Sequence, residues 1–322
     1  MLNFLFGKTT KPTTTPDVSE AQTEMQRPGT VLSREEQWYT EDAPSTPKTP
    51  SKDTTDTTDN TSDSNNSSNK PKHVFCHWHG DCSGSMQSMG DAGSKEGKNF
   101  CNEWRTFAKS NPETETEMSF YTFSAEGKLV YRGDPATMTD HNIEKCGRAM
   151  RPSSTTCLYD TAVPQAKEFL ANINAAYNAL PDEVKSSMTI KQVIGSTFML
   201  MTDGVDNMSH KYGSNDLKNI FAQLKEVGTT VCFAAANMDA MSVGKDYGLD
   251  ENTCLQMGSS EETGKTALRA MTDAAIRSAT RSRDTEATDE SYEVFTQAER
   301  FQSCDPVEAA MYTKKGRKIG LF

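Results

Sequence analysis

The chain has 322 residues, of which only 34% are hydrophobic, and its formal net charge at pH 7 is -11. Such an acidic chain is a poor binder of phosphate backbones, because non-specific affinity for nucleic acids comes from clustered Lys and Arg. The sequence contains no apolar stretch near the roughly 20 residues that span a bilayer. We therefore expect neither nucleic acid nor membrane as a partner, and a protein or small ligand is favoured.

The first 72 residues are dominated by Thr, Ser, Pro, Asp and Asn. Because this composition cannot bury enough apolar surface to offset the entropy lost on ordering, residues 1–72 are predicted to be disordered. The opening apolar residues, Met1–Phe6, are too few for the core of a signal peptide. The eight cysteines lack the spacing of a secreted disulfide framework, so a cytoplasmic location is predicted.

The folded part is predicted to begin with a buried strand over His73–His79, which places Asp81 at the carboxyl end of that strand. The next segment, Gly90–Gly97, is predicted to be a mobile loop because of its glycines. Apolar residues at three- and four-residue spacing then predict a helix over Asn99–Ser110.

The rest of the chain alternates helices with apolar strands. The long helix Leu158–Leu180 tolerates Pro164 only because that proline lies near its start. Further predicted elements are a hairpin over Met118–Tyr131, helices at Thr139–Cys146, Asp216–Glu226 and Gly264–Arg281, and strands at Thr197–Met201 and Thr229–Ala234. This alternation predicts an α/β fold with a doubly wound, mainly parallel sheet and helices on both faces. We assign it to residues 73–281, and residues 282–322 to a C-terminal tail, part of it helical.

Five oxygen-bearing side chains are predicted to meet at one edge of this sheet. Two acids follow buried strands and three hydroxyls lie on the intervening loops: Asp81, Ser83, Ser85, Thr156 and Asp203. Open α/β sheets bind ligands at the carboxyl ends of their strands, so these oxygens are expected to converge. Carboxylates and hydroxyls without thiolate or imidazole suit a hard divalent cation, Mg²⁺ or Mn²⁺.

The order Asp-x-Ser-x-Ser, then Thr, then Asp resembles the von Willebrand factor A (VWA) domain and its metal-ion-dependent adhesion site (MIDAS). The resemblance covers roughly Lys72 to Arg281 and is closest to free-standing VWA proteins of bacteria and phages. One departure is Ser154, since the family usually has glycine two residues before the threonine. In the family, the Asp-x-Ser-x-Ser residues ligate on one side, while Thr156 and Asp203 would alternate between direct and water-mediated contact.

The resemblance implies a metal-dependent protein-binding module and not an enzyme. The cation would accept an Asp or Glu carboxylate of a protein partner as its last ligand. The alternatives are an accessory or regulatory subunit of an ATPase or metal-stress system, and a metal-assisted hydrolase. Hydrolysis would need a general base beside the open coordination position, and the sequence offers only Asp206.

A second group of potential ligands consists of His73, His77 and His79 with Cys76 and Cys82, and imidazole and thiolate are zinc ligands. On a strand, however, His77 and His79 share one face and Cys76 points to the other. Because one tetrahedral ion cannot easily collect ligands from both faces, hydrogen-bonded core histidines are the favoured interpretation.

The segment Gly258–Thr266 is similar to a phosphate-binding loop. It has one residue too many between its glycines, and two of the intervening residues are glutamates, which repel phosphate. A helix start capped by Ser260 or Thr263 is the better interpretation, so no nucleotide site is expected.

Overall fold

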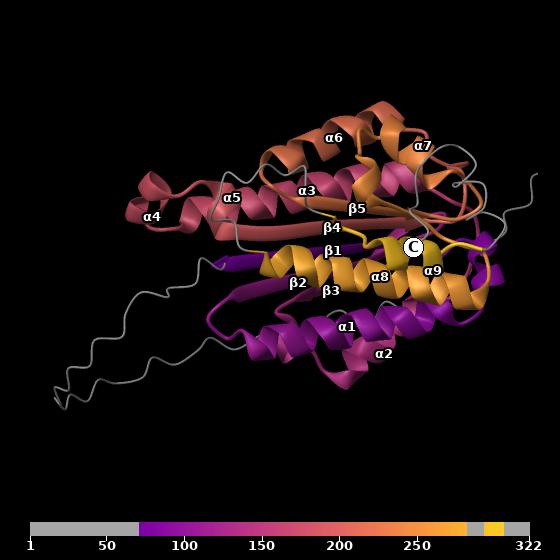
Figure 1. Cartoon of the computed structure of the whole chain (residues 1–322), viewed down its shortest axis with the longest axis horizontal. Helices are drawn as coiled ribbons and strands as arrows, with labels where there is room; N and C mark the ends of the chain where they lie inside the picture. Colours follow the sequence, from indigo (N-terminus) through magenta and orange to yellow (C-terminus); the bar gives the residue numbers. More distant parts are fainter. Residues whose placement is uncertain (1–70, 282–292, 306–322) are drawn as a thin grey trace, which may run out of the picture. The chain divides into compact units, whose positions relative to one another are not determined.

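The computed structural model describes residues 71–281 and 293–305 (Figure 1). The predicted disordered segment lies outside these residues, except for its last two. Pro71 is buried, and the Lys72 N–H donates to the Val193 carbonyl at 2.9 Å. Within the described part of the chain, no helix has the length and apolar character needed to cross a bilayer.

A six-stranded sheet forms the centre of the described unit, with strand order β3-β2-β1-β4-β5-β6. All neighbouring strands are parallel except the β2–β3 hairpin. The strands are β1 (His73–Asp81), β2 (Glu115–Phe123), β3 (Gly127–Gly133), β4 (Ile194–Thr202), β5 (Thr230–Ala235) and β6 (Cys254–Gln256). The predicted doubly wound, mainly parallel α/β class is confirmed.

Helices cover both faces of the sheet (Figure 1). One face carries α1 (Ala92–Ser110), α2 (Asp140–Ala149) and α8 (Glu261–Thr280), and the other carries α3 (Leu158–Ala179), α6 (Ser214–Glu226) and α7 (Ala240–Asp246). The shorter helices are α4 (Asp182–Ser187), α5 (Ile190–Val193) and α9 (Gln297–Gln302), with 3₁₀ turns at Gly84–Met89, Pro135–Thr137 and Glu251–Thr253. The buried apolar residues accordingly form two clusters, one on each face.

Helix α1 begins at Ala92, so the predicted mobile loop over Gly90–Gly97 is wrong. A Cβ added to Gly97 would lie 3.2 Å from both Met150 Cγ and Phe120 Cζ. The glycine therefore serves close packing of the helix against its neighbours, and it does not mark a turn. Glycine gives the same local signal in both situations, which only tertiary contacts distinguish.

The strand order places the site-bearing strands next to each other. β1 and β4 are parallel neighbours at the centre of the sheet. The chain leaves β1 toward α1 on one face and leaves β4 toward α6 on the other. A crevice outside the carboxyl ends of two such strands is where open α/β sheets hold their ligands.

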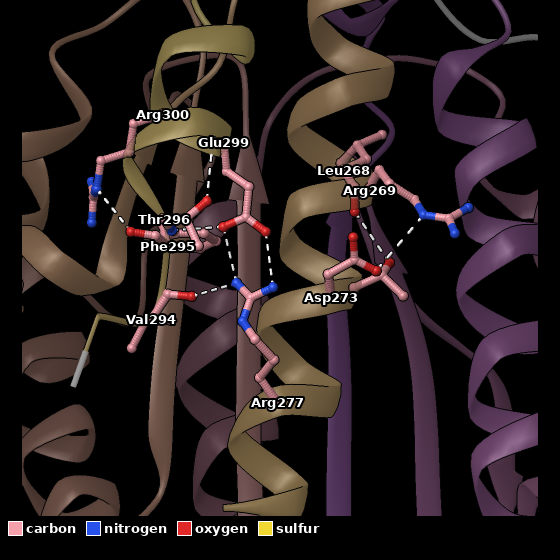
Figure 2. A network of polar contacts seen from close by, with 10 residues as sticks. Leu268, Arg269, Asp273, Arg277, Val294, Phe295, Thr296, Glu299 and Arg300 are labelled. Atoms are coloured by element: carbon pink, nitrogen blue, oxygen red, sulfur yellow. Dashed lines mark hydrogen bonds and ion pairs between the residues drawn. The ribbon is translucent and has the colours of Figure 1, made fainter. Parts of the chain in front are cut away.

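Part of the predicted C-terminal tail, residues 293–305, packs against the domain (Figure 2). Val294 and Phe295 are buried in the core cluster beneath α8. Arg277 of α8 donates two hydrogen bonds of 2.9 Å to the Glu299 carboxylate and one of 2.8 Å to the Val294 carbonyl. These contacts join α8 to residues 293–305, on the other side of residues 282–292. The helical part of residues 293–305 is α9.

The same segment also covers the edge strand β6. The Arg300 guanidinium donates to the carbonyls of Cys254 at 2.6 Å and Asn252 at 2.8 Å (Figure 2 shows Arg300 reaching away from α8). The Ser303 carbonyl accepts from the Gly258 N–H at 2.7 Å. Edge strands expose unpaired backbone groups, and the contact from Arg300 pairs one such carbonyl of β6, that of Cys254.

Candidate metal centre

Asp81 is the last residue of β1, and its carboxylate is fully buried. One oxygen accepts from the Ser83 N–H and the other from the Thr202 hydroxyl, each at 2.7 Å. Thr202 ends β4, so this contact ties the two central strands together and orients the carboxylate. Burial raises the pKa of Asp81, although the hydrogen bonds from Thr202 and Ser83 oppose the rise.

The hydroxyls of Ser83 and Ser85 meet Asp203, the first residue after β4. The two serine oxygens lie 3.0 Å apart, and Asp203 Oδ1 accepts from Ser85 Oγ at 2.7 Å and from Ser83 Oγ at 3.5 Å. Two ligands at right angles around a cation with bonds of 2.0–2.1 Å are about 2.9 Å apart. Two of the three oxygen–oxygen distances, 3.0 and 2.7 Å, are close to this spacing, and the third is longer at 3.5 Å.

The second oxygen of Asp203 is buried and has no hydrogen-bond partner among the described residues. Burial and the neighbouring Asp81 charge raise the pKa of Asp203 to about 6, against the opposing hydrogen bond from Ser85. An unsatisfied buried carboxylate oxygen is costly, and a bound cation would satisfy it. The donor set of carboxylates and hydroxyls fits Mg²⁺ or Mn²⁺.

Thr156 is buried on the loop before α3. Its backbone is paired with Asn207: the Thr156 N–H donates to the Asn207 side-chain oxygen, and the Asn207 N–H donates to the Thr156 carbonyl, both at 3.1 Å. A Cβ built on Gly204 would lie 3.6 Å from Ser85 Oγ and 3.7 Å from Thr156 Oγ1. The Thr156 and Ser85 hydroxyls thus face the same point beside Gly204. All five predicted oxygens are gathered at this edge of the sheet.

Ser154, where the VWA pattern has glycine, adopts the left-handed conformation with φ of 57°. This region costs non-glycine residues roughly 1–2 kcal/mol. The Ser154 carbonyl accepts from the Gly84 N–H at 2.8 Å, which joins the Thr156 loop to the Asp-x-Ser-x-Ser loop. The backbone therefore has the left-handed conformation that glycine would adopt without strain, and it is strained with serine at this position.

Asp206, the predicted candidate for a general base, anchors the loop that follows β4. Its Oδ1 accepts from the Leu158 N–H at 2.8 Å and from the Ser209 hydroxyl at 2.6 Å. Its Oδ2 accepts from the Ser209 N–H at 3.3 Å. The carboxylate thus serves the N-terminus of α3, where backbone N–H groups lack helical partners.

Asp160 anchors the far end of the same loop, and sequence reasoning did not identify it. Its carboxylate accepts from three consecutive backbone N–H groups, those of His210 at 2.9 Å, Lys211 at 2.9 Å and Tyr212 at 2.7 Å. Burial alone would raise the pKa of Asp160, but these donors outweigh it and lower the pKa. The only signal in the sequence is its place four residues after Thr156.

The histidine and cysteine group does not form one cluster. His77 and His79 are hydrogen-bonded to each other on one face of β1, while Cys76 lies in the core of the other face, as predicted. His73 pairs with an exposed glutamate of β2 at 3.1 Å, and the Cys82 thiol donates to a β2 carbonyl at 3.2 Å. Among residues 71–281 and 293–305, no three His, Cys, Asp or Glu side chains are placed to hold a metal.

The segment Gly258–Thr266 forms the start of α8. Ser260 is the N-cap residue, and its hydroxyl accepts from the Thr263 N–H at 3.2 Å. Two glutamates occupy the first turn of α8, where acidic residues are favoured by the helix dipole. The predicted helix start describes this segment correctly.

Comparison with protein-family models gives no match, and neither does comparison with curated protein sequences. Among solved structures, the chain is similar to proximal thread matrix protein 1 from the mussel byssus with a zinc-occupied MIDAS motif, at 13% identity and a TM-score of 0.40, over 65% of this chain and 46% of that one. It is also similar to the vWF domain of the type V pili tip protein Mfa5 from Porphyromonas gingivalis, at 11% identity and a TM-score of 0.40, over 67% of this chain and 99% of that one. A third similar structure is the manganese-loaded TRAP protein of Plasmodium vivax, at 14% identity and a TM-score of 0.34, over 62% of this chain and 72% of that one. The chain spans less than half the length of the mussel protein.

Proposed function

We propose that this chain contains a VWA domain that binds a protein partner through Mg²⁺ or Mn²⁺ in a MIDAS. The observation that carries the proposal is the buried second oxygen of Asp203, which has no hydrogen-bond partner among the described residues, whereas the first oxygen accepts from two serine hydroxyls. A purely structural carboxylate in that position would be expected to have its lone pairs satisfied. A hard cation is the group that fits such a set of oxygens.

The five oxygens would come from Asp81, Ser83, Ser85, Thr156 and Asp203. Two carboxylates neutralise a divalent charge, and five protein ligands leave an octahedral ion one ligand short. A partner's Asp or Glu carboxylate is the charged oxygen ligand that suits the remaining position. When bound, the cation would supply the positive charge that attracts this carboxylate.

The surface beside the site supports a protein partner. Val205 is 75% exposed and Met208 is 39% exposed, and both lie on the loop that begins at Asp203. Asp206 and Asp160 hold this loop with several hydrogen bonds, so the two apolar side chains are presented on an ordered backbone. Exposed apolar side chains next to a charged anchor are common features of protein-binding surfaces.

We propose that the protein is not an enzyme. The candidate base Asp206 is engaged by Leu158 and Ser209, which gives the hydrolase alternative no support. We also propose a reducing compartment such as the cytoplasm, and its support is that all eight cysteines are free thiols in buried positions.

The experiment that tests the function begins with capture of partners by the full chain in Mn²⁺ and in excess chelator. An identified partner is then titrated against the wild type and Thr156→Ala. We expect binding to vanish in chelator and to return with Mn²⁺ or Mg²⁺. We expect Thr156→Ala to weaken partner binding more than Mn²⁺ binding. Undiminished partner binding in chelator would move the interaction away from the metal site.

A further inference from the structure

A continuous series of polar contacts crosses the core from β2 to the start of α3. Ser119 Oγ lies 2.7 Å from His77 Nδ1, His77 Nε2 lies 3.4 Å from His79 Nδ1, and His79 Nε2 lies 3.3 Å from Thr161 Oγ1. All four side chains are buried. Replacing apolar core residues by imidazoles carries a desolvation cost, so the series needs a physical reason.

The direction of each hydrogen bond follows from its last member. The Thr161 hydroxyl donates to the carbonyls of Cys157 at 2.7 Å and Leu158 at 3.0 Å, so its oxygen can only accept from His79. His79 must then carry its proton on Nε2, which leaves Nδ1 to accept from His77 Nε2. His77 Nδ1 in turn accepts the Ser119 hydroxyl proton. The hydrogen bonds therefore fix the Nε2–H tautomer on both imidazole rings.

The surroundings keep both rings neutral and fixed in orientation. His77 stacks on Phe198 at 4.5 Å between ring centroids, and His79 stacks on Tyr121 at 5.0 Å and Phe123 at 4.8 Å. Both imidazoles are only 1% exposed, and burial disfavours the charged form of a ring. Neutral imidazoles in a fixed tautomer can orient a neighbour but cannot supply charge.

The series ends beside the candidate metal centre. The carbonyl that Thr161 holds belongs to Cys157, the residue after Thr156, and Asn207 holds the backbone of Thr156 itself. His77, His79 and Asp81 alternate along β1 and so belong to the same face of that strand. The Thr156 loop is thus fastened on one side to the loop after β4 and on the other to β1.

We propose that Ser119, His77, His79 and Thr161 form a relay of hydrogen bonds that positions the Thr156 hydroxyl relative to Asp81 in the metal site. The proposal rests on the proposed function, because it takes Thr156 to be a metal ligand. The four residues are positioning residues and do not themselves contact the metal. The relay accounts for the two core histidines, which do not belong to a zinc site.

The first test compares two isosteric substitutions at buried threonines. Thr161→Val breaks the relay, whereas Thr197→Val removes a buried hydroxyl that has no hydrogen-bond partner in the described part of the chain. Mn²⁺ alone is titrated into each full-length variant. We expect Thr161→Val to bind Mn²⁺ about three- to tenfold more weakly, the equivalent of one net hydrogen bond, and Thr197→Val to match the wild type. His79→Phe should weaken binding similarly, and the double variant should add little, because both changes break one relay.

The second test needs no variant. Long-range ¹H–¹⁵N spectra of the imidazoles should show the Nε2–H tautomer for both His77 and His79. An Nδ1–H tautomer at either ring would overturn the relay, and so would a folded Thr161→Val with wild-type Mn²⁺ affinity. If the wild type bound no Mn²⁺, the proposed function would fail and the positioning role with it. Binding by the wild type with no loss in Thr161→Val would defeat the relay alone.

Discussion

Two aspartates that contact the two ends of the β4–α6 loop have opposite surroundings: Asp203 is the first residue of the loop, and Asp160 lies in the first turn of α3. Asp160 accepts three backbone N–H donors from the far end of the loop, which lower its pKa. Asp203 begins the loop, keeps one buried oxygen without a partner among the described residues, and has its pKa raised to about 6. Asp160 therefore uses its charge to hold the backbone, while Asp203 retains an oxygen for a ligand. The two side chains are chemically the same, and the hydrogen-bond donors around each carboxylate make the difference.

The largest expected effect is on Mn²⁺ affinity, which should depend strongly on Asp203 and little on Asp160. Asp203→Asn removes a ligand charge, and because even outer partners of metal ligands are worth about 10- to 100-fold, we expect a loss of about 100-fold or more in Mn²⁺ affinity. Asp81→Ala should behave alike. Asp160→Asn is the matched control and should stay within about threefold of the wild type, because Asp160 binds the backbone of residues 210–212 and is not an outer partner of any proposed ligand. Titration calorimetry measures all three, and wild-type affinity in Asp203→Asn would remove the metal assignment.

For folding stability we expect the reverse: substituting Asp160 should cost more than substituting Asp203. Hydrogen bonds to a charged group contribute about 1.5–3 kcal/mol, so Asp160→Asn should lower the free energy of unfolding by roughly that amount. Asp203→Asn should leave the metal-free protein as stable as the wild type or more stable, because it removes a poorly compensated buried charge. Urea denaturation in chelator gives both values. A marked loss of stability in Asp203→Asn would indicate a structural carboxylate.

The raised pKa of Asp203 predicts opposite pH responses with and without metal. Without metal, the folded state holds a proton on Asp203 up to its pKa of about 6, whereas the unfolded chain releases it near the ordinary aspartate pKa of 3.8. Stability in chelator should therefore fall as pH rises from about 4 to 6. A cation needs the ionised carboxylate, so Mn²⁺ affinity should fall as pH drops below about 6. Titrations at several pH values test this, and a pH-independent affinity between 5 and 7 would contradict it.

Much of the site could be predicted because its signals are local. The apolar strands place Asp81 and Asp203 at strand ends, and the helix predicted over Thr139–Cys146 is α2, where Thr139 forms a capping box with Asn142. Likewise the predicted helix Leu158–Leu180 agrees with α3, which ends at Ala179. These features depend on residues within a few positions of each other, which sequence patterns record.

The remainder depends on contacts between distant parts of the chain. Asp160 meets backbone groups about 50 residues away, so its three donors are invisible in sequence. The pairing of Arg277 with Glu299 and the burial of Phe295 fix residues 293–305 on the domain without any sustained apolar period. Short elements such as α7 and β6 were also not predicted, since seven and three residues carry little periodicity.

The smallest expected effect concerns the strain at Ser154, the departure from the VWA pattern. Ser154→Gly relieves the left-handed conformation but adds entropy to the unfolded chain, so we expect a net gain of about 0.5–1 kcal/mol in unfolding free energy. The Mn²⁺ affinity should not change, since the backbone already has the required shape. The neighbouring Ser153→Gly is the control, and it should lose a few tenths of a kcal/mol. A loss of stability in Ser154→Gly would show that the serine makes a contact worth more than the strain.

The most direct test of the metal assignment is a crystal structure of the full chain grown with Mn²⁺, with anomalous differences measured to locate the ion. We expect one strong peak at the carboxyl ends of β1 and β4, within about 2.0–2.3 Å of the oxygens of Ser83 and Ser85. Asp203 should contact the ion directly or through one water. A map with no peak there, and with the second oxygen of Asp203 bonded to water alone, would contradict a metal-dependent site.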